Sequence, residues 1–312
     1  MKKTRVGPGA DDFLKEHLNL WWLRPESALW DAAASAVIAR APFAGPALDL
    51  GCGNGLFSFV TAGGSIGPAY DWFVHSDAKD FAKGRDIYDV KVSVDPGRHI
   101  LRAPRRKFDW GLDHKASLLS QAARLGFYGE LKEGNAQEGL DFEDGSFGTV
   151  FSNILYWLKD PAARMKEISR LLRKDGCALL CLPDPSFKTL CASYQWKARR
   201  SEFLRLLSRG RADCHHWTAR SSDIKRWADA AGLRVEQDQR YLSPETLAFW
   251  DFGLRPLSPA LLEMARRLKP ADRADVKALW IESALPILRE LLALDARRSG
   301  RGGFHFAVLR KR

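Results

Sequence analysis

The sequence has little cysteine and few close pairs of thiols. Five cysteines are scattered at positions 52, 177, 181, 191 and 214 of 312 residues, and no two of them form a C-x-x-C pair. An odd number of scattered thiols gives no disulfide framework. We therefore expect reduced thiols and a cytoplasmic location, and we predict no metal site.

Long hydrophobic runs are also lacking. No stretch approaches the ~20 uninterrupted apolar residues that a membrane span requires. The basic residues near Met1 are not followed by the apolar segment of a signal peptide. The composition, 46% hydrophobic and 28% charged, is that of a globular protein. The length allows one large domain, or one domain with a substantial addition.

Positive charge is in excess, with a formal net charge of +11 and arginine-rich runs at 102–107, 297–301 and 310–312. An ordinary solvated surface explains such an excess. Attraction to an anionic partner, such as a phosphorylated metabolite, a lipid head group or a nucleic acid, explains it as well. The charge alone does not choose between these interpretations.

A glycine-rich motif is the most informative feature of the chain. Residues 47–55 read Ala-Leu-Asp-Leu-Gly-Cys-Gly-Asn-Gly, and an apolar segment beginning at Leu56 follows. The pattern predicts a buried strand, a tight turn and a helix, in which glycines let the backbone approach a ligand. The Gly-x-Gly-x-Gly spacing differs from the dinucleotide fingerprint and from the phosphate loop. The motif could therefore also be a tight turn that binds no ligand.

Strands and helices alternate along the rest of the sequence. This alternation predicts an α/β fold with a doubly wound, mostly parallel sheet of seven strands and helical capping additions. A short apolar run at 72–75 is a weaker strand candidate, so 65–107 is interpreted as an insertion. The predicted strands are 47–50, 108–113, a segment within 129–136, 147–151, 177–182, a strand opening at 233–235, and 304–309. The predicted helices lie in 11–40, 116–125, 161–172, 221–231 and 244–296.

The glycine motif resembles motif I of the class I S-adenosylmethionine (SAM) dependent methyltransferases. The segment Ser152–Asp160 resembles their type 11-like small-molecule group. The resemblance covers 46–60, 108–182 and 215–240, with a weaker tail at 303–310. It implies a Rossmann-like fold, SAM as cofactor and methyl transfer. The implied organisation is an N-terminal helical lid at 1–45 and a SAM-binding domain at 46–312, with the insertion at 65–107 and a helical cap at 244–300.

The same resemblance implies a set of cofactor-binding residues. Asp113 would bind the ribose hydroxyls, since a carboxylate accepts several hydrogen bonds; capping of the next helix is its alternative. His114 would lie near adenine or simply on the surface. The family often has Asp-Ala where this chain has Asn135-Ala136, but an Asn carbonyl still accepts the adenine amino hydrogen. Asp49 would brace the loop, and Asn153 would line the methionine end of the cofactor. The remaining implied residues are those of the loop itself, Gly51, Cys52, Gly53, Asn54 and Gly55.

Motifs that the sequence lacks narrow the range of acceptors that the enzyme could methylate. The chain lacks the Asp/Asn-Pro-Pro-Tyr/Phe segment of base-amino methyltransferases, and its Leu182-Pro183-Asp184-Pro185 lacks the cysteine of cytosine C5 enzymes. Loops at 183–220 and 241–303 leave strand carboxyl ends and should cap the acceptor. We predict a small or medium-sized acceptor, with oxygen the favoured atom, and an anionic acceptor or a homo-oligomer left open. The alternatives are an RNA or protein methyltransferase that uses the basic surface and a non-catalytic SAM-binding scaffold.

Three residues are candidates for removing the acceptor's proton. His215 and His216 lie in a predicted capping loop and could act as base. Tyr156, after the fourth strand, is a lesser candidate. A pair of packing or surface histidines is the alternative interpretation.

Overall fold

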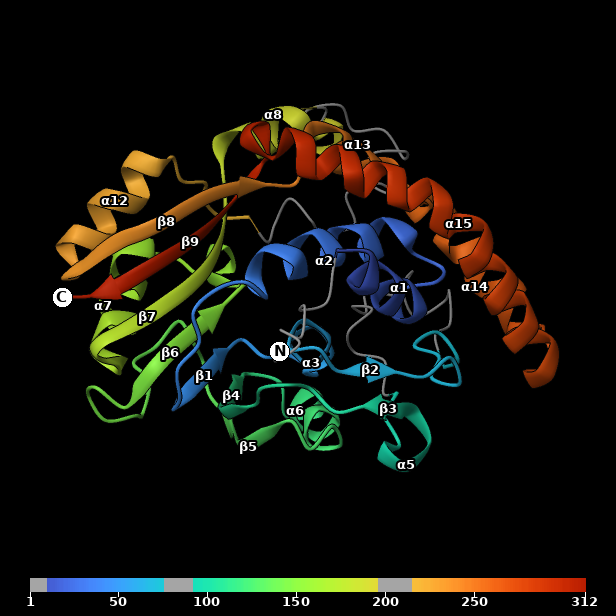
Figure 1. Cartoon of the computed structure of the whole chain (residues 1–312), viewed down its shortest axis with the longest axis horizontal. Coiled ribbons are helices and arrows are strands. Elements are labelled where there is room, and N and C mark those ends of the chain that lie inside the picture. The colour runs from blue at the N-terminus through green and yellow to red at the C-terminus, as the bar shows by residue number, and fades with distance from the viewer. Residues whose placement is uncertain (1–9, 76–91, 196–214) are drawn as a thin grey trace, which may run out of the picture.

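A seven-stranded sheet is the framework of the fold and occupies the left part of Figure 1. The computed structural model describes residues 10–75, 92–195 and 215–312. The strand order is β5-β4-β1-β6-β7-β9-β8, and β9 alone runs antiparallel to its neighbours. The predicted fold class is confirmed. The strands are β1 Ala47–Leu50, β4 Phe108–Asp113, β5 Tyr128–Glu133, β6 Phe147–Ser152, β7 Leu172–Pro183, β8 Leu233–Tyr241 and β9 Phe304–Lys311.

Helices cover both faces of the sheet, which is why the central strands are apolar throughout. Every residue of β1 and β6 is buried, as expected for strands packed on both sides. On one face, Leu48 and Leu50 share a core with α7 (Pro161–Leu171) and α12 (Ser221–Ala230). The other face is covered by α1 (Ala10–Leu20), α2 (Pro25–Ile38) and α3 (Leu56–Thr61).

The helical additions pack on one another as well as on the sheet. The predicted N-terminal helix is divided in two, and Pro25 occupies the first turn of α2, where its missing N–H is tolerated. Helix α2 contacts α13 and α15, and α1 contacts α15 (Figure 1). The remaining helical elements are α6 Ala116–Ala123, η2 Leu155–Trp157, α8 Pro185–Leu190, α9 Ala192–Gln195, α13 Pro244–Phe252, η3 Arg255–Leu257, α14 Ser258–Arg266, α15 Pro270–Arg298 and η4 Ser299–Arg301.

The described part of residues 65–107 is bound to the N-terminal helices and to α15. It holds β2 (Ser65–Ile66), α5 (Pro96–His99) and β3 (Ile100–Arg102), with β2 antiparallel to β3. The weak strand candidate at 72–75 forms turns instead. Its neighbour Asp71 accepts hydrogen bonds from Trp22 Nε1 (3.0 Å) and from Arg273 Nε (2.6 Å). Trp22 lies between α1 and α2, and Arg273 belongs to α15. One carboxylate therefore connects residues 65–107 to the N-terminal helices and to α15.

No helix among the described residues combines the length and the apolar character needed to cross a membrane. Cysteines 52, 177, 181 and 191 are buried. Cys214 lies outside the described residues.

Candidate cofactor and acceptor site

The glycine loop follows β1 at the carboxyl edge of the sheet. Its glycines at 51, 53 and 55 have φ angles of +85°, +56° and +78°, which other residues rarely adopt. The backbone N–H groups of Gly51 and Cys52 both donate to Leu112 O, at 2.8 and 2.9 Å. A Cβ on Gly51 would lie 2.2 Å from Ile154 Cγ1, whereas a Cβ on Gly53 would meet nothing within 4 Å. The loop is therefore tightly packed at Gly51 and open at Gly53.

Asp113, at the end of β4, braces this loop. Its Oδ2 accepts from Gly53 N (2.9 Å) and its Oδ1 from Lys115 N (2.9 Å). The carboxylate thus joins the glycine loop to the start of α6, where Lys115 is the N-cap residue. A carboxylate has about four lone-pair sites, so it retains capacity for ribose hydroxyls. His114 lies beside it, with Nδ1 3.4 Å from Asp113 Oδ1 and 64% of its side chain exposed.

Asp49 supports the loop through contacts with neighbouring elements. Tyr128 at the start of β5 donates its hydroxyl to Asp49 Oδ2 at 2.7 Å. Burial raises the pKa of Asp49 to about 6, against the opposing effect of hydrogen bonds from Ser58 and Tyr128. A Cβ on Gly55 would lie 2.8 Å from Tyr128 Cε2. Tyr128 was not predicted from the sequence, because no local pattern links it to Asp49, 79 residues away.

Asn54 carries a donor that the protein does not use. Its Oδ1 accepts from Leu56 N (3.2 Å), but its buried Nδ2 has no hydrogen-bond partner among the described residues. A buried donor without a partner is costly. A ligand that brings an acceptor oxygen to the glycine loop would satisfy it.

The ends of β5 and β6 supply the other predicted cofactor residues. Asn135 is exposed, accepts from Gln137 N (3.0 Å) and donates to Glu138 Oε1 (2.8 Å). Its amide therefore forms a local turn, and its oxygen retains one lone pair. Ala136 is half-buried next to it. Asn153 is half-buried and its side chain makes no hydrogen bond with the described residues, which leaves its amide available to a ligand.

The structure brings two of the three predicted acceptor-side residues together. The ring of His215 stacks on Tyr156, with centroids 4.7 Å apart and planes at 13°. His215 is 8% exposed, and its Nδ1 is 2.6 Å from the Tyr194 hydroxyl. His216 is exposed, and its backbone N–H donates to Tyr156 O at 3.1 Å. The main chain of His216 thus fixes the segment that carries His215 against Tyr156.

Further aromatic rings pack around this pair. Phe187 of α8 lies 4.7 Å from His215 and 5.1 Å from Phe304, measured between centroids. The ring centroid of Trp30 of α2 lies 4.9 Å from that of Phe304 and 4.6 Å from that of Trp250. The sequence analysis missed these rings, which converge from elements far apart in the chain. We call this set the aromatic cluster, and it consists of Trp30, Tyr156, Phe187, Tyr194, His215, Trp250 and Phe304.

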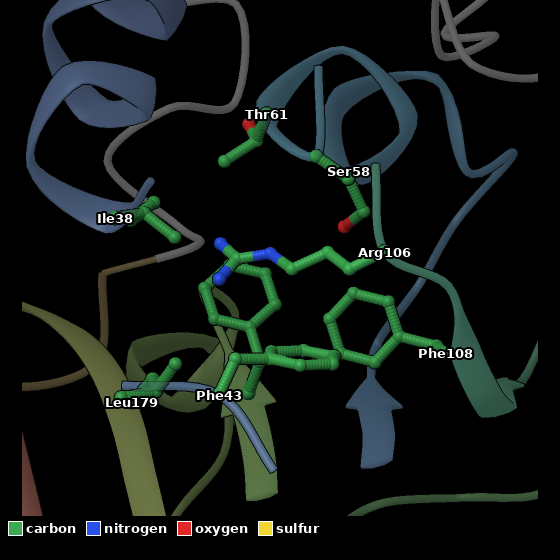
Figure 2. Close-up of a pocket in the computed structure, with 9 residues that line it drawn as sticks. Ile38, Phe43, Ser58, Thr61, Arg106, Phe108 and Leu179 are labelled. Atoms are coloured by element: carbon green, nitrogen blue, oxygen red, sulfur yellow. The ribbon is translucent and has the colours of Figure 1, made fainter. Parts of the chain in front are cut away.

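A small cavity lies between the helices α2 and α3 and the strands β4, β6 and β7, and it is not a ligand site. It has a volume of about 10 Å³, room for about one water molecule. Figure 2 shows the Arg106 guanidinium between Ile38 and Thr61, and it lies 4.6 Å from the centre of the Phe43 ring. We assign this arginine to packing between α2 and the strands.

Comparison with known proteins identifies the family. A model of a methyltransferase domain matches residues 28–238, about two thirds of the chain. A search of curated proteins found no match.

Solved structures to which the chain is similar include a SAM-dependent methyltransferase from Thermotoga maritima, with 12% identity, 97% coverage of each chain and a TM-score of 0.45. Another, from Mesorhizobium loti, has 15% identity, covers 90% of this chain and 99% of its own, and has a TM-score of 0.45. Geranyl diphosphate methyltransferase, solved with SAM, has 13% identity, coverage of 92% and 90%, and a TM-score of 0.40.

The residues at the carboxyl edge fit SAM. The open side of Gly53, the unpaired Asn54 amide and the free amide of Asn153 suit the polar methionine end, and the spare lone pairs of Asp113 suit the ribose. The chain belongs to the methyltransferase domain family, and it is a SAM-dependent methyltransferase.

Proposed function

We propose that this enzyme methylates a small or medium-sized acceptor, at oxygen. The aromatic cluster is the observation that carries the proposal. Tyr156 follows β6, and Phe304 pairs with Pro183 at the end of β7, so the cluster lies at the same edge as the glycine loop. In open parallel sheets, ligands bind at this edge. Rings drawn from the lid, α8, α13 and β9 form an apolar wall suited to a compact molecule.

The wall suits the chemistry that the chain must perform. SAM, when bound, supplies an already activated methyl group. Orientation of the acceptor and exclusion of water are then the main tasks of the protein. We propose that the stacked rings of Tyr156 and His215 hold the acceptor, with the Tyr194 hydroxyl fixing the orientation of the imidazole.

The basic run at 102–107 is placed poorly for a large anionic acceptor. It precedes β4 and so lies at the opposite edge of the sheet. Arg102 Nε donates to Gly63 O (2.9 Å), and Lys107 Nζ donates to Gly126 O (2.8 Å). These contacts favour a structural role over RNA binding. We retain a cytoplasmic location, and we leave open an anionic acceptor and a homo-oligomer.

Transfer of label from methyl-labelled SAM, incubated with a fractionated cell extract, tests the proposal. We expect the label in an O-methylated compound of the small-molecule fraction. His215→Gln should raise KM for that compound at least tenfold and leave binding of S-adenosylhomocysteine within twofold. His216→Gln is the matched control and should change neither. Label confined to RNA or protein, or equal effects of the two substitutions, would contradict the proposal.

A further inference from the structure

A buried histidine joins the strands β8 and β9 to the segment that follows β7. The His305 side chain on β9 is 1% exposed. Its Nδ1 lies 2.7 Å from Asp238 Oδ1 of β8, and its Nε2 lies 3.0 Å from Asp184 Oδ2. A carboxylate only accepts hydrogen bonds, and a neutral imidazole has a single N–H to donate. With a carboxylate at each ring nitrogen, the geometry fits the protonated imidazolium. We call Asp184, His305 and Asp238 the His305 bridge.

The charges around the bridge also favour the imidazolium. Burial lowers the pKa of His305, but the hydrogen bonds and charges of the two aspartates outweigh it and raise the pKa above its ordinary value. Two other described groups face the bridge. Arg240 Nη2 of β8 donates to Asp184 Oδ1 at 2.7 Å, and the side chain of Ser221 of α12 hydrogen-bonds to Asp238. Above the raised pKa the ring keeps one N–H, so one of its two hydrogen bonds must be lost.

Asp184 is also the N-cap residue of the helix α8. Its Oδ1 accepts from Ser186 N at 2.8 Å, and its own backbone N–H donates to Gly303 O, just before β9, at 2.8 Å. Arg240 Nη2 adds a hydrogen bond to Ser186 Oγ at 2.6 Å. A helix of six residues depends on such tertiary contacts for its position. The bridge therefore fixes the N-terminus of α8 against β8 and β9.

Helix α8 carries Phe187, a buried ring of the aromatic cluster. The ring centroid of Phe187 lies 4.7 Å from that of His215 and 5.1 Å from that of Phe304. Phe304 directly precedes His305 on β9. The bridge thus adjoins one ring of the cluster along the chain and positions a second ring through α8.

We propose that His305 is a positioning residue for the acceptor, which in its protonated form holds α8, and thereby Phe187, in place against His215. This inference rests on the proposed function, because it takes the aromatic cluster as the acceptor wall. The contact at Nδ1 is the shorter one, so the neutral ring should keep its proton there and release Asp184. The acceptor's KM should then rise with pH. Cofactor affinity should not follow, since β6 and β7 separate β9 from the strand β1 that precedes the cofactor loop.

Two measurements on the full-length protein need no acceptor. In 15N-histidine NMR, the ring signals of His305 are identified by their loss in His305→Gln, and we expect both nitrogens to be protonated at pH 6. Hydrogen exchange of residues 185–191, corrected for the intrinsic effect of pH, should quicken at least tenfold as this ring loses its proton. Asp238→Asn removes a charge that favours the imidazolium, so both transitions should move to lower pH. A neutral ring at pH 6, or exchange that does not follow the titration, would overturn the inference.

A third measurement follows methyl transfer from labelled SAM to the small-molecule acceptor at pH 6 and pH 9. The wild-type KM for the acceptor should rise at least fivefold, with binding of S-adenosylhomocysteine within twofold. His305→Gln cannot titrate, so it should show the raised KM at both pH values. His75→Gln, which removes an exposed histidine, is the matched control and should behave as wild type. Wild-type pH dependence of KM in His305→Gln would overturn the inference alone. Absence of any labelled small molecule with wild type would overturn the proposed function and the positioning role with it.

Discussion

Replacement of Asp113 by asparagine tests the cofactor site most sharply. The substitution removes the negative charge but keeps one oxygen acceptor for the backbone N–H groups of Gly53 and Lys115. A hydrogen bond to a charged group contributes about 1.5–3 kcal/mol. Loss of this contribution should weaken binding of S-adenosylhomocysteine roughly 10- to 150-fold. One of the two backbone donors also loses its partner, at a cost of about 1–3 kcal/mol in folding stability.

Asp109 provides a matched control on the same strand. It lies at the other end of β4, where its Oδ2 accepts from Ala47 N at 2.7 Å. Asp109→Asn should lower the melting temperature modestly and leave the affinity for S-adenosylhomocysteine unchanged. Isothermal titration calorimetry and thermal denaturation measure both quantities. Wild-type affinity in Asp113→Asn would refute ribose binding and leave Asp113 as a brace only. Equal weakening in both variants would show a general effect of destabilising β4.

Two further predictions concern the glycine loop and a buried histidine. Gly51→Ala should prevent stable folding or abolish cofactor binding, because its new methyl carbon would lie 2.2 Å from a side-chain atom of Ile154. Gly126 also has a positive φ, but a Cβ there would meet nothing within 4 Å. Gly126→Ala should therefore lower the free energy of unfolding by only about 1–2 kcal/mol. Thermal denaturation with and without S-adenosylhomocysteine separates the two, and equal losses would contradict the argument. Burial lowers the pKa of His305, but hydrogen bonds with Asp238 (2.7 Å) and Asp184 (3.0 Å) outweigh it and raise the pKa above 6.5. This pairing stabilises the fold fully below pH 6.5 and is lost as pH rises through the raised value. His305→Gln should flatten the loss of stability above pH 6.5; an unchanged slope would refute it.

Local sequence patterns predicted the sheet well. The strand at 108–113 and the glycine turn have clear local signals, and the structure places both as expected. Strands β7 and β8 are longer than predicted. The polar end of β8 carries no strand pattern and is ordered by pairing with β9. The added polar start of β7 lies before the residues that pair with β9, and it begins at Leu172, which pairs with Phe147 of β6.

Contacts between distant segments could not be predicted in this way. Asp71 finds its partners 49 and 202 residues away, in Trp22 and Arg273. Asp49 likewise takes a hydrogen bond from the hydroxyl of Tyr128, 79 residues away. Such contacts arise from tertiary packing, and local sequence patterns do not predict them.

The most direct test of the enzyme's function is the fate of the methyl group. Wild-type protein and Asp113→Asn are incubated with methyl-labelled SAM and a cell extract, and the products are separated into small molecules, RNA and protein. We predict a labelled small molecule, methylated at oxygen, that is reduced at least tenfold with Asp113→Asn at subsaturating SAM. Label only in RNA or protein, or no labelled product while cofactor binding is intact, would contradict the account.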